Sequence, residues 1–344
     1  MDKFRDKIFN EEVFETYRRT LESTKENSLI KNALFNVVNK YKAKMSEQSG
    51  GYVVVEPIKG RLGGTPVNYD GNTNIPKGSE RDTFYQRKIC FGRAKAWGEY
   101  DFASDITGAN FKAEAREVNE YWDEQRQSTV LSILKGIFSM TGGVNGAFVD
   151  KHTYTVSGNL TADALNRAAQ KALGDKKAKM DVIFMHSIVS TNLEGLNLID
   201  FLKYTDSDGI QRDLTIGTFN GKLVVVDDEM PSETTGEGAQ AVTTYTSYVF
   251  QKGFFEYENI GAEVPSEIAR DPYDKGGKTD LITRVREMIV PYLISYKGTG
   301  TVSPEDTDFE NGSNWELVNN DKTGNAKVYV DDKLIPVARI VSQG

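Results

Sequence analysis

Three consecutive acidic residues, Asp227, Asp228 and Glu229, are the feature of this sequence with the clearest chemical potential. They follow the apolar run 223–226, and acids at the end of a strand can ligate a metal ion or act as general acid and base in hydrolysis. His186, which follows another apolar run, could complete such a set. Because no second acidic motif accompanies them, a turn at a strand end is the favoured interpretation. A metal-dependent hydrolase is the alternative.

Histidine and cysteine are too scarce for the usual catalytic and metal sites. His152 and His186 are the two histidines, and Cys90 is the single cysteine. One cysteine excludes an intrachain disulfide and a cysteine-based zinc site. A Ser-His-Asp triad would need one of the histidines, but no Gly-x-Ser-x-Gly motif accompanies either. We therefore predict a hydrogen-bonded structural role for His186, and no catalytic, cofactor-binding or metal-binding residue in the chain.

Three stretches match ligand-binding loops only in part. Residues 275–279 end in Gly-Gly-Lys-Thr, but Pro272 stands where the first glycine of a phosphate-binding loop belongs. Residues 217–222 are one residue short of that loop and continue with Leu223 instead of serine or threonine. Residues 206–209 begin like a calcium loop but lack its further oxygen ligands and closing glutamate. The sequence therefore predicts that neither glycine-rich stretch binds phosphate and that residues 206–209 form a polar turn.

Composition limits the classes of function. The 344 residues are 38% apolar and 27% charged, enough for one large domain or two medium ones. The net charge is -8, without a basic run, so a surface that grips nucleic acid through its phosphates is not indicated. An acidic surface is compatible with enclosing DNA without adhering to it. The sequence shows no signal-peptide pattern and no run of ~18 apolar residues, which predicts a cytosol-like compartment.

The first 95 residues predict an arm followed by a protruding hairpin. Residues 1–49 are charged and carry two apolar sets at helical spacing, which are too thin for a core of their own. Within 50–95, the β-type runs 52–55 and 88–91 flank a polar, glycine-rich span. A loop this long is uncommon in a compact monomer and usually binds something. We therefore expect an arm that docks elsewhere and an extended β-hairpin.

A long amphipathic helix over 110–138 is the clearest single element. Apolar residues recur there every three or four positions, and acidic and basic residues fill the other side. Asn110 is the expected N-cap. Such a helix is roughly 40 Å long at ~1.5 Å per residue, longer than a typical domain needs. We interpret it as a structural spine.

The remainder of the chain predicts a mixture of helices and strands, so the fold class is α+β. Residue 254 begins a run that we expect to pair with the preceding strand. The expected helices are 161–173, capped by Thr161, and 187–196; the expected strands or apolar runs are 181–185, 223–226, 243–250, 254–257, 281–294, 328–330 and 335–337.

At residues 182–231 the sequence resembles a stretch typical of phage major capsid proteins. A strand ends in Met-His-Ser, a helix and a Leu-Ile-Asp-Phe segment follow, and a Val-Val-Val-Asp-Asp-x-Met-Pro strand and turn ends the block. Residues 93–98 and the Asn-Trp-Glu at 314–316 agree in order, so the resemblance covers about 90–340. The matching residues of the central block are Met185, His186, Ser187, Leu198, Ile199, Asp200, Phe201, Gly221, Val224, Val225, Val226, Asp227, Asp228, Met230 and Pro231.

The resemblance implies the Hong Kong 97-type capsid fold and a subunit without enzymatic activity. Copies would assemble into hexamers and pentamers of an icosahedral shell that encloses double-stranded DNA, with the extended loop across a neighbouring subunit. An encapsulin-type nanocompartment shell and a tail-tube or baseplate protein are alternatives. The implied parts are an arm (1–49), an extended loop (50–95), a peripheral domain with the spine helix (96–170), an axial domain that returns to the peripheral one (171–296) and a C-terminal β-rich segment (297–344).

The same resemblance implies the partners and the location. The main partner is the chain itself, with a separate scaffolding protein and a portal, and with room for a decoration protein. No membrane and no sequence-specific contact with DNA is expected. The subunit would be assembled in the bacterial host cytoplasm and end in the virion capsid. Lys59 and Lys77 lie in the extended loop, but the sequence assigns no covalent crosslink to them.

Overall fold

The computed structural model describes residues 35–47, 52–75, 81–101, 115–205, 211–236, 241–298 and 300–343. Four features predicted from sequence lie outside these ranges: the helical arm before residue 35, the Asn110 cap, Lys77 and the 206–209 turn. In the described part of the chain, no helix is both long and apolar enough to span a membrane.

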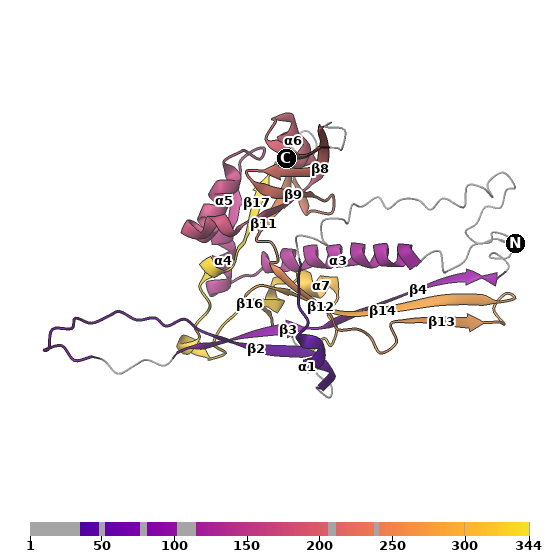
Figure 1. Ribbon diagram of the computed structural model, residues 1–344, viewed down its shortest axis with the longest axis horizontal. Helices are drawn as coiled ribbons and strands as arrows, with labels where there is room; N and C mark the ends of the chain where they lie inside the picture. The colour runs from indigo at the N-terminus through magenta and orange to yellow at the C-terminus, as the bar shows by residue number, and fades with distance from the viewer. Residues whose placement is uncertain are drawn as a thin grey trace.

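The spine helix runs through the middle of the molecule as α3, Ala115–Ile137 (Figure 1). This confirms the predicted long helix. Its C-terminal half is almost wholly enclosed, and Ile133, Leu134 and Ile137 have no exposed surface. These residues belong to one apolar core that also contains residues of both large sheets. The helix is therefore the element on which the rest of the molecule packs.

A peripheral sheet lies along one side of α3. Its central strand, β14 (Lys278–Pro291), pairs with β4 (Phe91–Tyr100) along one edge and with β13 (Ser266–Asp271) and then β12 (Phe255–Asn259) along the other. The short strand β1 (Phe35–Val37) adds to β12 in parallel. Since alternate residues of a strand share a face, every second residue of β14 is directed at α3. The β4, β13 and β14 ends extend beyond the body (Figure 1).

The extended hairpin projects from the opposite end of the body (Figure 1). Strands β2 (Val53–Lys59) and β3 (Thr83–Ile89) pair antiparallel in the register Val53 to Ile89, so the predicted hairpin is confirmed there. Residues 91–95 were also expected in the hairpin, but they belong to β4 and pair with β14. The hairpin is therefore shorter at its C-terminal side than the sequence suggested.

The axial region is built on an eight-stranded sheet of order β5-β17-β11-β6-β9-β8-β7, with β10 beside β11. The two buried strands predicted at 181–185 and 223–226 are adjacent and parallel as β6 and β9. Helices α5 and α6 cover one face and enclose a second apolar core. The bounds are β5 Thr153–Thr155, β6 Val182–Met185, β7 Ile199–Thr205, β8 Gln211–Phe219, β9 Lys222–Val226, β10 Ser232–Thr235, β11 Val242–Phe250, β17 Val337–Ser342, α4 Gly143–His152, α5 Ala164–Leu173 and α6 Ser187–Gly195.

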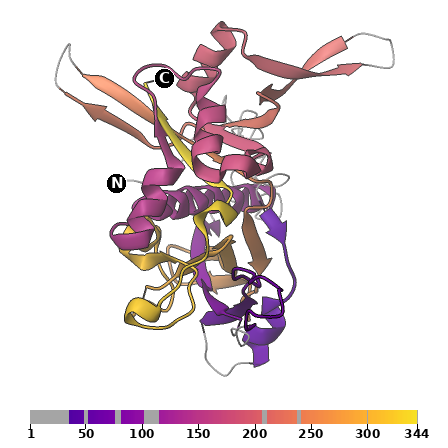
Figure 2. The ribbon, with the colours of Figure 1, turned by 90° about the vertical axis from the view of Figure 1, so that its left-hand side faces the viewer.

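Two ribbons leave the axial sheet on opposite sides, as Figure 2 shows. One is the β7–β8 hairpin and the other is the β10–β11 hairpin. The sequence analysis predicted the strand 243–250, which is β11, but neither ribbon as a hairpin. The turn between β8 and β9 has positive φ at Asn220 (51°) and Gly221 (72°), the conformation of a two-residue hairpin turn.

The C-terminal segment differs from its predicted β-rich character. Its strand content is β16, paired with β15, and the last strand β17, which lies between β5 and β11. Tyr329 forms only an isolated bridge with Asn319, and β17 begins at Val337. The other bounds are α1 Tyr41–Glu47, β15 Ile294–Tyr296, α7 Asp306–Glu310, β16 Trp315–Leu317 and the 3-10 turns Gly174–Lys179, Gly312–Asn314, Gly324–Ala326 and Asp332–Leu334.

Three further expectations were wrong, two of them because a tertiary partner outweighed the local pattern and one because of a local contact at a helix start. Phe35–Val37 is a strand and not a helix, since it completes the edge of β12. Residues 254–257 do not pair with 243–250; β12 pairs with β14 and β11 pairs with β6 and β17. Helix α5 starts at Ala164 with Asp163 at its N-cap, and Thr161 instead donates a 2.8 Å hydrogen bond to the Asp163 carboxylate.

Candidate assembly surfaces

The acidic run after β9 forms a turn. The Asp227 carboxylate accepts hydrogen bonds from the Glu229 amide (2.8 Å) and from the side-chain amide of Gln127 on α3. Asp228 is exposed, and its nearest carboxylate oxygen lies 3.9 Å from Nδ1 of His186. Among the described residues, no three or more histidine, cysteine, aspartate or glutamate side chains are grouped to hold a metal. The geometry fits the predicted strand-end turn and lends no support to the hydrolase.

Both histidines are engaged by the backbone. Nδ1 of His186 accepts the Ile188 amide at 3.2 Å and so caps α6, in the structural role that the sequence predicted. His152 is buried, and its Nδ1 lies 2.6 Å from the Val337 carbonyl oxygen, to which it donates. Burial lowers the pKa of His152 and outweighs this hydrogen bond, which favours the charged form. His152 is therefore a neutral packing residue.

The two glycine-rich stretches are both strand connections. Residues 217–222 span the β8–β9 hairpin turn, and the amine of Lys222 is directed at the Met180 carbonyl. Residues 272–277 form the bend between β13 and β14, where Gly276 and Gly277 have positive φ. Neither stretch opens a helix, as a phosphate-binding loop would.

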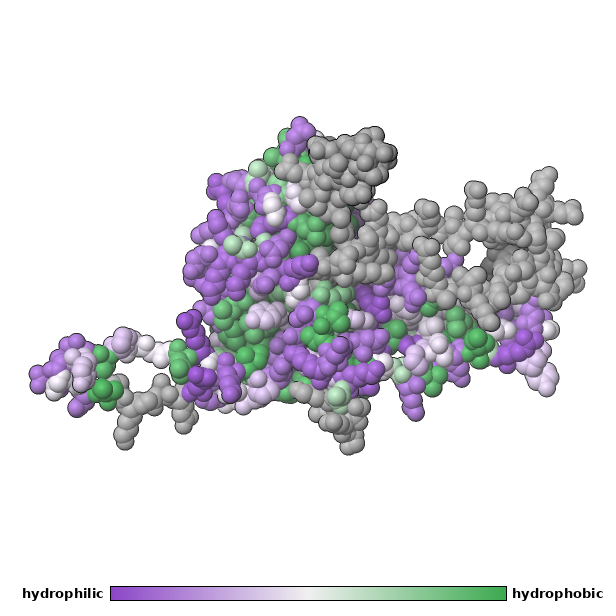
Figure 3. All heavy atoms as spheres, viewed as in Figure 1, coloured by the Kyte–Doolittle hydropathy of each residue, from purple (hydrophilic) through white to green (hydrophobic). Residues whose placement is uncertain are grey.

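The described part of the hairpin loop, residues 60–75, exposes apolar side chains. Tyr69 is 91% exposed and Leu62 71%, and green hydrophobic spheres stand among polar ones on this loop in Figure 3. The loop also has a defined local shape, because the Asp70 carboxylate accepts the backbone amides of Asn72 and Thr73. It is a shaped surface that the described part of its own chain leaves exposed.

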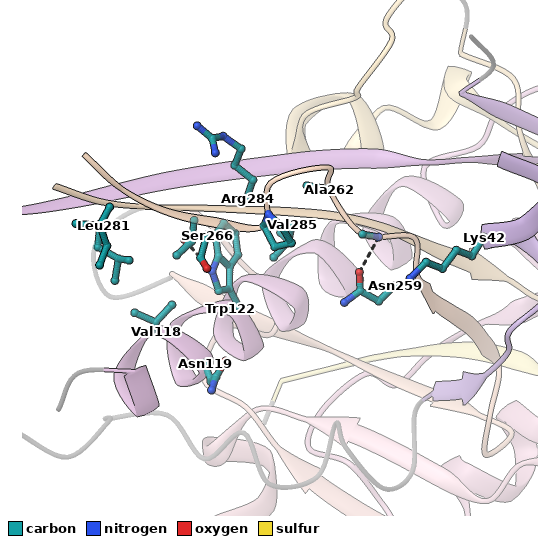
Figure 4. A pocket seen from close by; sticks show the side chains of 14 residues that line it. Lys42, Val118, Asn119, Trp122, Asn259, Ala262, Ser266, Leu281, Arg284 and Val285 are labelled. Carbon is teal, nitrogen blue, oxygen red and sulfur yellow. Dashed lines mark hydrogen bonds between the residues drawn. The ribbon is translucent and has the colours of Figure 1, made fainter. Parts of the chain in front are cut away.

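A groove of about 830 Å³ lies between the N-terminal half of α3 and the β13–β14 strands. Trp122 points from α3 into this space (Figure 4). Its indole N–H donates a hydrogen bond of 3.2 Å to the Thr283 hydroxyl. Arg284, on the alternate face of β14, points away from it (Figure 4). We call this the peripheral groove; the apolar residues that line it are Val118, Trp122, Ala262, Pro265, Ile268, Leu281 and Val285.

The hairpin loop and the peripheral groove are at opposite ends of one chain (Figure 1). The loop therefore cannot fill the groove of its own chain. An exposed apolar projection and an exposed apolar hollow at two separate places make a heterologous contact between copies possible. Such head-to-tail contacts close into rings when the rotation between copies allows it.

A charged cluster ties the base of the hairpin to the body. The amine of Lys88 on β3 lies 2.5 Å from the Glu56 carboxylate of β2, 2.7 Å from the Glu256 carboxylate of β12 and 2.5 Å from the hydroxyl of Tyr41 on α1. Only 1% of the Lys88 side chain is exposed. We call Tyr41, Glu56, Lys88 and Glu256 the hairpin joint.

The joint keeps its carboxylates ionised. Burial raises the pKa of Glu56, but the hydrogen bond and charge of Lys88 outweigh this and bring it to about 2. The same balance lowers the pKa of Glu256. Burial, with the neighbouring Glu256 charge, raises the pKa of Tyr41, so its phenol stays protonated. Next to the joint, the Glu258 carboxylate accepts the backbone amides of Lys40, Tyr41 and Lys42 and so caps α1.

A second polar connection joins α3 to the two sheets. Arg126 donates to the Glu287 carboxylate of β14 at 2.9 Å, and Glu287 also accepts the Tyr257 hydroxyl at 2.9 Å. One residue further along α3, Gln127 reaches Asp227 of the axial region. The sequence analysis found neither connection nor the hairpin joint. Their only local signal is a charged or amide residue within an apolar pattern, and their partners are distant in the chain.

The fold built from these parts occurs in solved phage capsids. The capsid of cyanophage Pam1 matches over 93% of this chain and 90% of its own, with a TM-score of 0.53 and 10% identity. The capsid of Helicobacter pylori bacteriophage KHP30 matches over 100% of both chains (TM-score 0.52, 11% identity), and that of Ralstonia phage GP4 over 79% and 85% (TM-score 0.51, 10% identity). The chain therefore has the Hong Kong 97-type capsid fold, as the resemblance implied.

At the level of sequence, no family model matches the chain. The major capsid protein of Bacillus phage SPP1 is 30% identical to it over 263 residues, which is 72% of this chain and 76% of the relative. The chain belongs to the family of phage major capsid proteins. It is a structural coat protein, not an enzyme, and the family predicted from residues 182–231 is confirmed.

Proposed function

We propose that the chain builds an icosahedral shell of hexamers and pentamers around double-stranded phage DNA, with the hairpin loop of one copy seated in the peripheral groove of the next. The observation that carries this arrangement is the placement of the exposed loop and the apolar groove at opposite ends of one subunit. Each contact would bury Leu62 and Tyr69, and full burial of such a side chain stabilises by about 1.5–3 kcal/mol.

The parts of the chain divide accordingly. The arm (1–49) reaches towards a neighbouring copy, the extended loop (50–95) crosses the next subunit, and the spine helix in 96–170 is a rigid lever between them. Residues 171–296 form the axial region around the capsomer axis and then return to the peripheral sheet through β12, β13 and β14. The last segment, 297–344, was expected to stand apart, but its strand β17 lies inside the axial sheet, so we assign that strand to the axial region.

The remaining partners follow from what the assembly of a phage shell requires. We infer a separate scaffolding protein, a portal and an optional decoration protein, and assembly in the bacterial host cytoplasm before the subunit reaches the virion. The net charge of -8 supports enclosure of DNA without specific binding. An encapsulin-type shell is the rival closest in architecture, and enclosed DNA rather than cargo enzyme would separate the two.

Assembly of the full chain tests the proposal. Leu62→Ser and Tyr69→Ser remove apolar surface from the loop, and Ile268→Ser removes it from the groove. Asn74→Ser is the matched control, since it changes a polar residue of the same loop. We expect the three apolar variants to keep the thermal stability of the wild-type subunit while the yield of closed shells in electron micrographs falls at least tenfold.

Two outcomes would contradict parts of this proposal separately. Wild-type chains that form rods or stay monomeric when expressed with their scaffold would refute the shell itself. Normal shells from the Leu62 and Tyr69 variants would leave the shell intact and refute the seating of the loop in the groove.

A further inference from the structure

The hairpin joint connects three parts of the subunit through one set of charges. Tyr41 comes from the arm, Glu56 and Lys88 from the hairpin, and Glu256 from the peripheral sheet. The Tyr41 hydroxyl lies 3.0 Å from the Glu56 carboxylate and 2.9 Å from that of Glu256. A change in any one of these parts therefore alters the hydrogen bonds of the other two.

Buried polar contacts hold the hairpin where it meets the body, beside the apolar packing of Ile89 in the large core. On the inward face of β3, Gln86 is buried and donates to the carbonyls of Pro291 and Ile294, both at 3.0 Å. Lys88 follows two residues later on the same face. A small apolar cluster accompanies them, with Met45 from the arm and Val54 from the hairpin, while Ile89 on β3 belongs to the large core. Polar contacts are directional and are lost when one partner is removed or neutralised, whereas apolar burial depends on neither direction nor charge.

The charges of the joint are balanced only while both carboxylates are ionised. Lys40 approaches from the solvent side, 3.3 Å from Glu56 and 3.6 Å from Glu256, so two cations face two anions. Removing the anions would leave Lys88 as a buried, unpaired charge, which is strongly unfavourable. The titratable and charged groups that face the joint are Lys40, Tyr41 and Lys42 at α1, Glu56 on β2, Lys88 on β3, and Glu256 and Glu258 on β12.

We propose that the hairpin joint is an acid-sensitive hinge that couples the arm to the hairpin. With Glu56 and Glu256 ionised, the arm and the hairpin are both fixed on β12. When these carboxylates are protonated, Lys88 loses its partners, and the hairpin and α1 loosen together at the joint, while α3 and the axial sheet keep their packing. This hinge belongs to the single subunit and does not depend on how the loop binds a neighbour.

The direction of the pH effect follows from the carboxylates. Their pKa values are lower in the folded protein than in an exposed chain. Their contribution is therefore fully present above the ordinary pKa of a glutamate and is lost as the pH falls towards the folded value. For Glu56 that interval runs from 4.5 down to about 2.

Hydrogen exchange on the full-length unassembled chain at pH 7 tests the coupling. In Glu56→Gln/Glu256→Gln, we expect amides of 41–47 and 83–89 to exchange at least tenfold faster, with no change in 131–137 of α3. Tyr41→Phe removes only the shared hydroxyl, and we expect it to speed exchange in the hairpin as well as in α1. The matched control, Glu310→Gln, breaks the exposed ion pair with Lys135 and should change neither segment.

Fluorescence anisotropy tests the acid response. A dye on Tyr69→Cys reports hairpin motion, since the native Cys90 is buried. We expect anisotropy to fall between pH 4.5 and 2 in the otherwise wild-type chain, and to be low and independent of pH in the Glu56→Gln/Glu256→Gln background. An equal acid transition in both backgrounds would overturn the hinge. Faster exchange in α1 alone for Tyr41→Phe would overturn the coupling.

Discussion

Replacement of Gly136 by alanine should destabilise the subunit, although alanine is the better helix former. Gly136 is in the last turn of α3, where an added β-carbon would lie 1.8 Å from the Phe309 carbonyl oxygen and 2.6 Å from the indole nitrogen of Trp315. These two atoms are themselves joined by a 2.7 Å hydrogen bond. Because the obstructing oxygen belongs to the backbone, α7 has to move away from α3 as a unit.

The expected loss of stability in Gly136→Ala follows from three contributions. Overpacking of this kind costs about 1–3 kcal/mol, the disrupted Trp315 hydrogen bond costs about 1 kcal/mol, and the gain in helix propensity returns about 1 kcal/mol. We therefore expect Gly136→Ala to lower the free energy of unfolding by about 1–3 kcal/mol. For a large domain this corresponds to a fall of about 2–6 °C in the midpoint of thermal unfolding.

The matched control is Gly146→Ala, within α4. There the new β-carbon would meet backbone atoms of Thr141 only at 3.6 and 3.8 Å, which is ordinary contact. We expect this variant to equal the wild type or to gain up to about 1 kcal/mol. Both variants are compared by differential scanning calorimetry of the unassembled chain. If the Gly136→Ala protein were as stable as the Gly146→Ala protein, α7 would not be packed closely against the spine helix at this position.

Three further predictions concern single positions. Gln127→Ala removes the buried amide that reaches Asp227, so the free energy of unfolding in urea should fall by about 1–3 kcal/mol. An unchanged unfolding midpoint would contradict a stabilising hydrogen bond between Gln127 and Asp227. Burial lowers the pKa of His152 below its ordinary value of 6.5, so its contribution to stability is present above pH 6.5 and is lost as the pH falls. In parallel urea titrations, the wild type should lose stability relative to His152→Gln as the pH falls below 6.5. Gly221 has a φ of 72°, so Gly221→Ala should lower the free energy of unfolding by about 1–2 kcal/mol. At Gly195 an added β-carbon would meet open space, so Gly195→Ala should not lower it.

The local sequence pattern was sufficient to predict those elements whose own residues show a clear apolar pattern. The spine helix repeats its apolar residues over many turns, and the strands β6 and β9 are short, continuous apolar runs, so each was predicted close to its observed bounds. The block 182–231 also carried the family, because its Val-Val-Val-Asp-Asp turn and the Met-His-Ser cap lie close together in the chain.

Elements stabilised by distant partners were not predictable in this way. Phe35–Val37 is a strand because β12 offers an edge more than 200 residues later. The C-terminal strand is short and ambiguous by composition, and its place between β5 and β11 depends on both neighbours. Lys88 gives the clearest case. A lysine in a strand pattern predicts a solvent-exposed position, and only Glu56, Glu256 and Tyr41 together make its burial favourable.

The contacts that connect the parts of the subunit differ in kind, and this difference bears on how a shell closes. The axial region and the peripheral sheet share one apolar core around the C-terminal half of α3. This core resists displacement because a close-packed interior has low compressibility. The base of the hairpin reaches that core through Ile89, but charged groups and one small apolar cluster hold it together with α1 and β12. Subunits of a closed shell occupy unequal surroundings, so some part must adjust. The packing places that adjustment in the hairpin and arm, where a few hydrogen bonds can be exchanged without opening either large core.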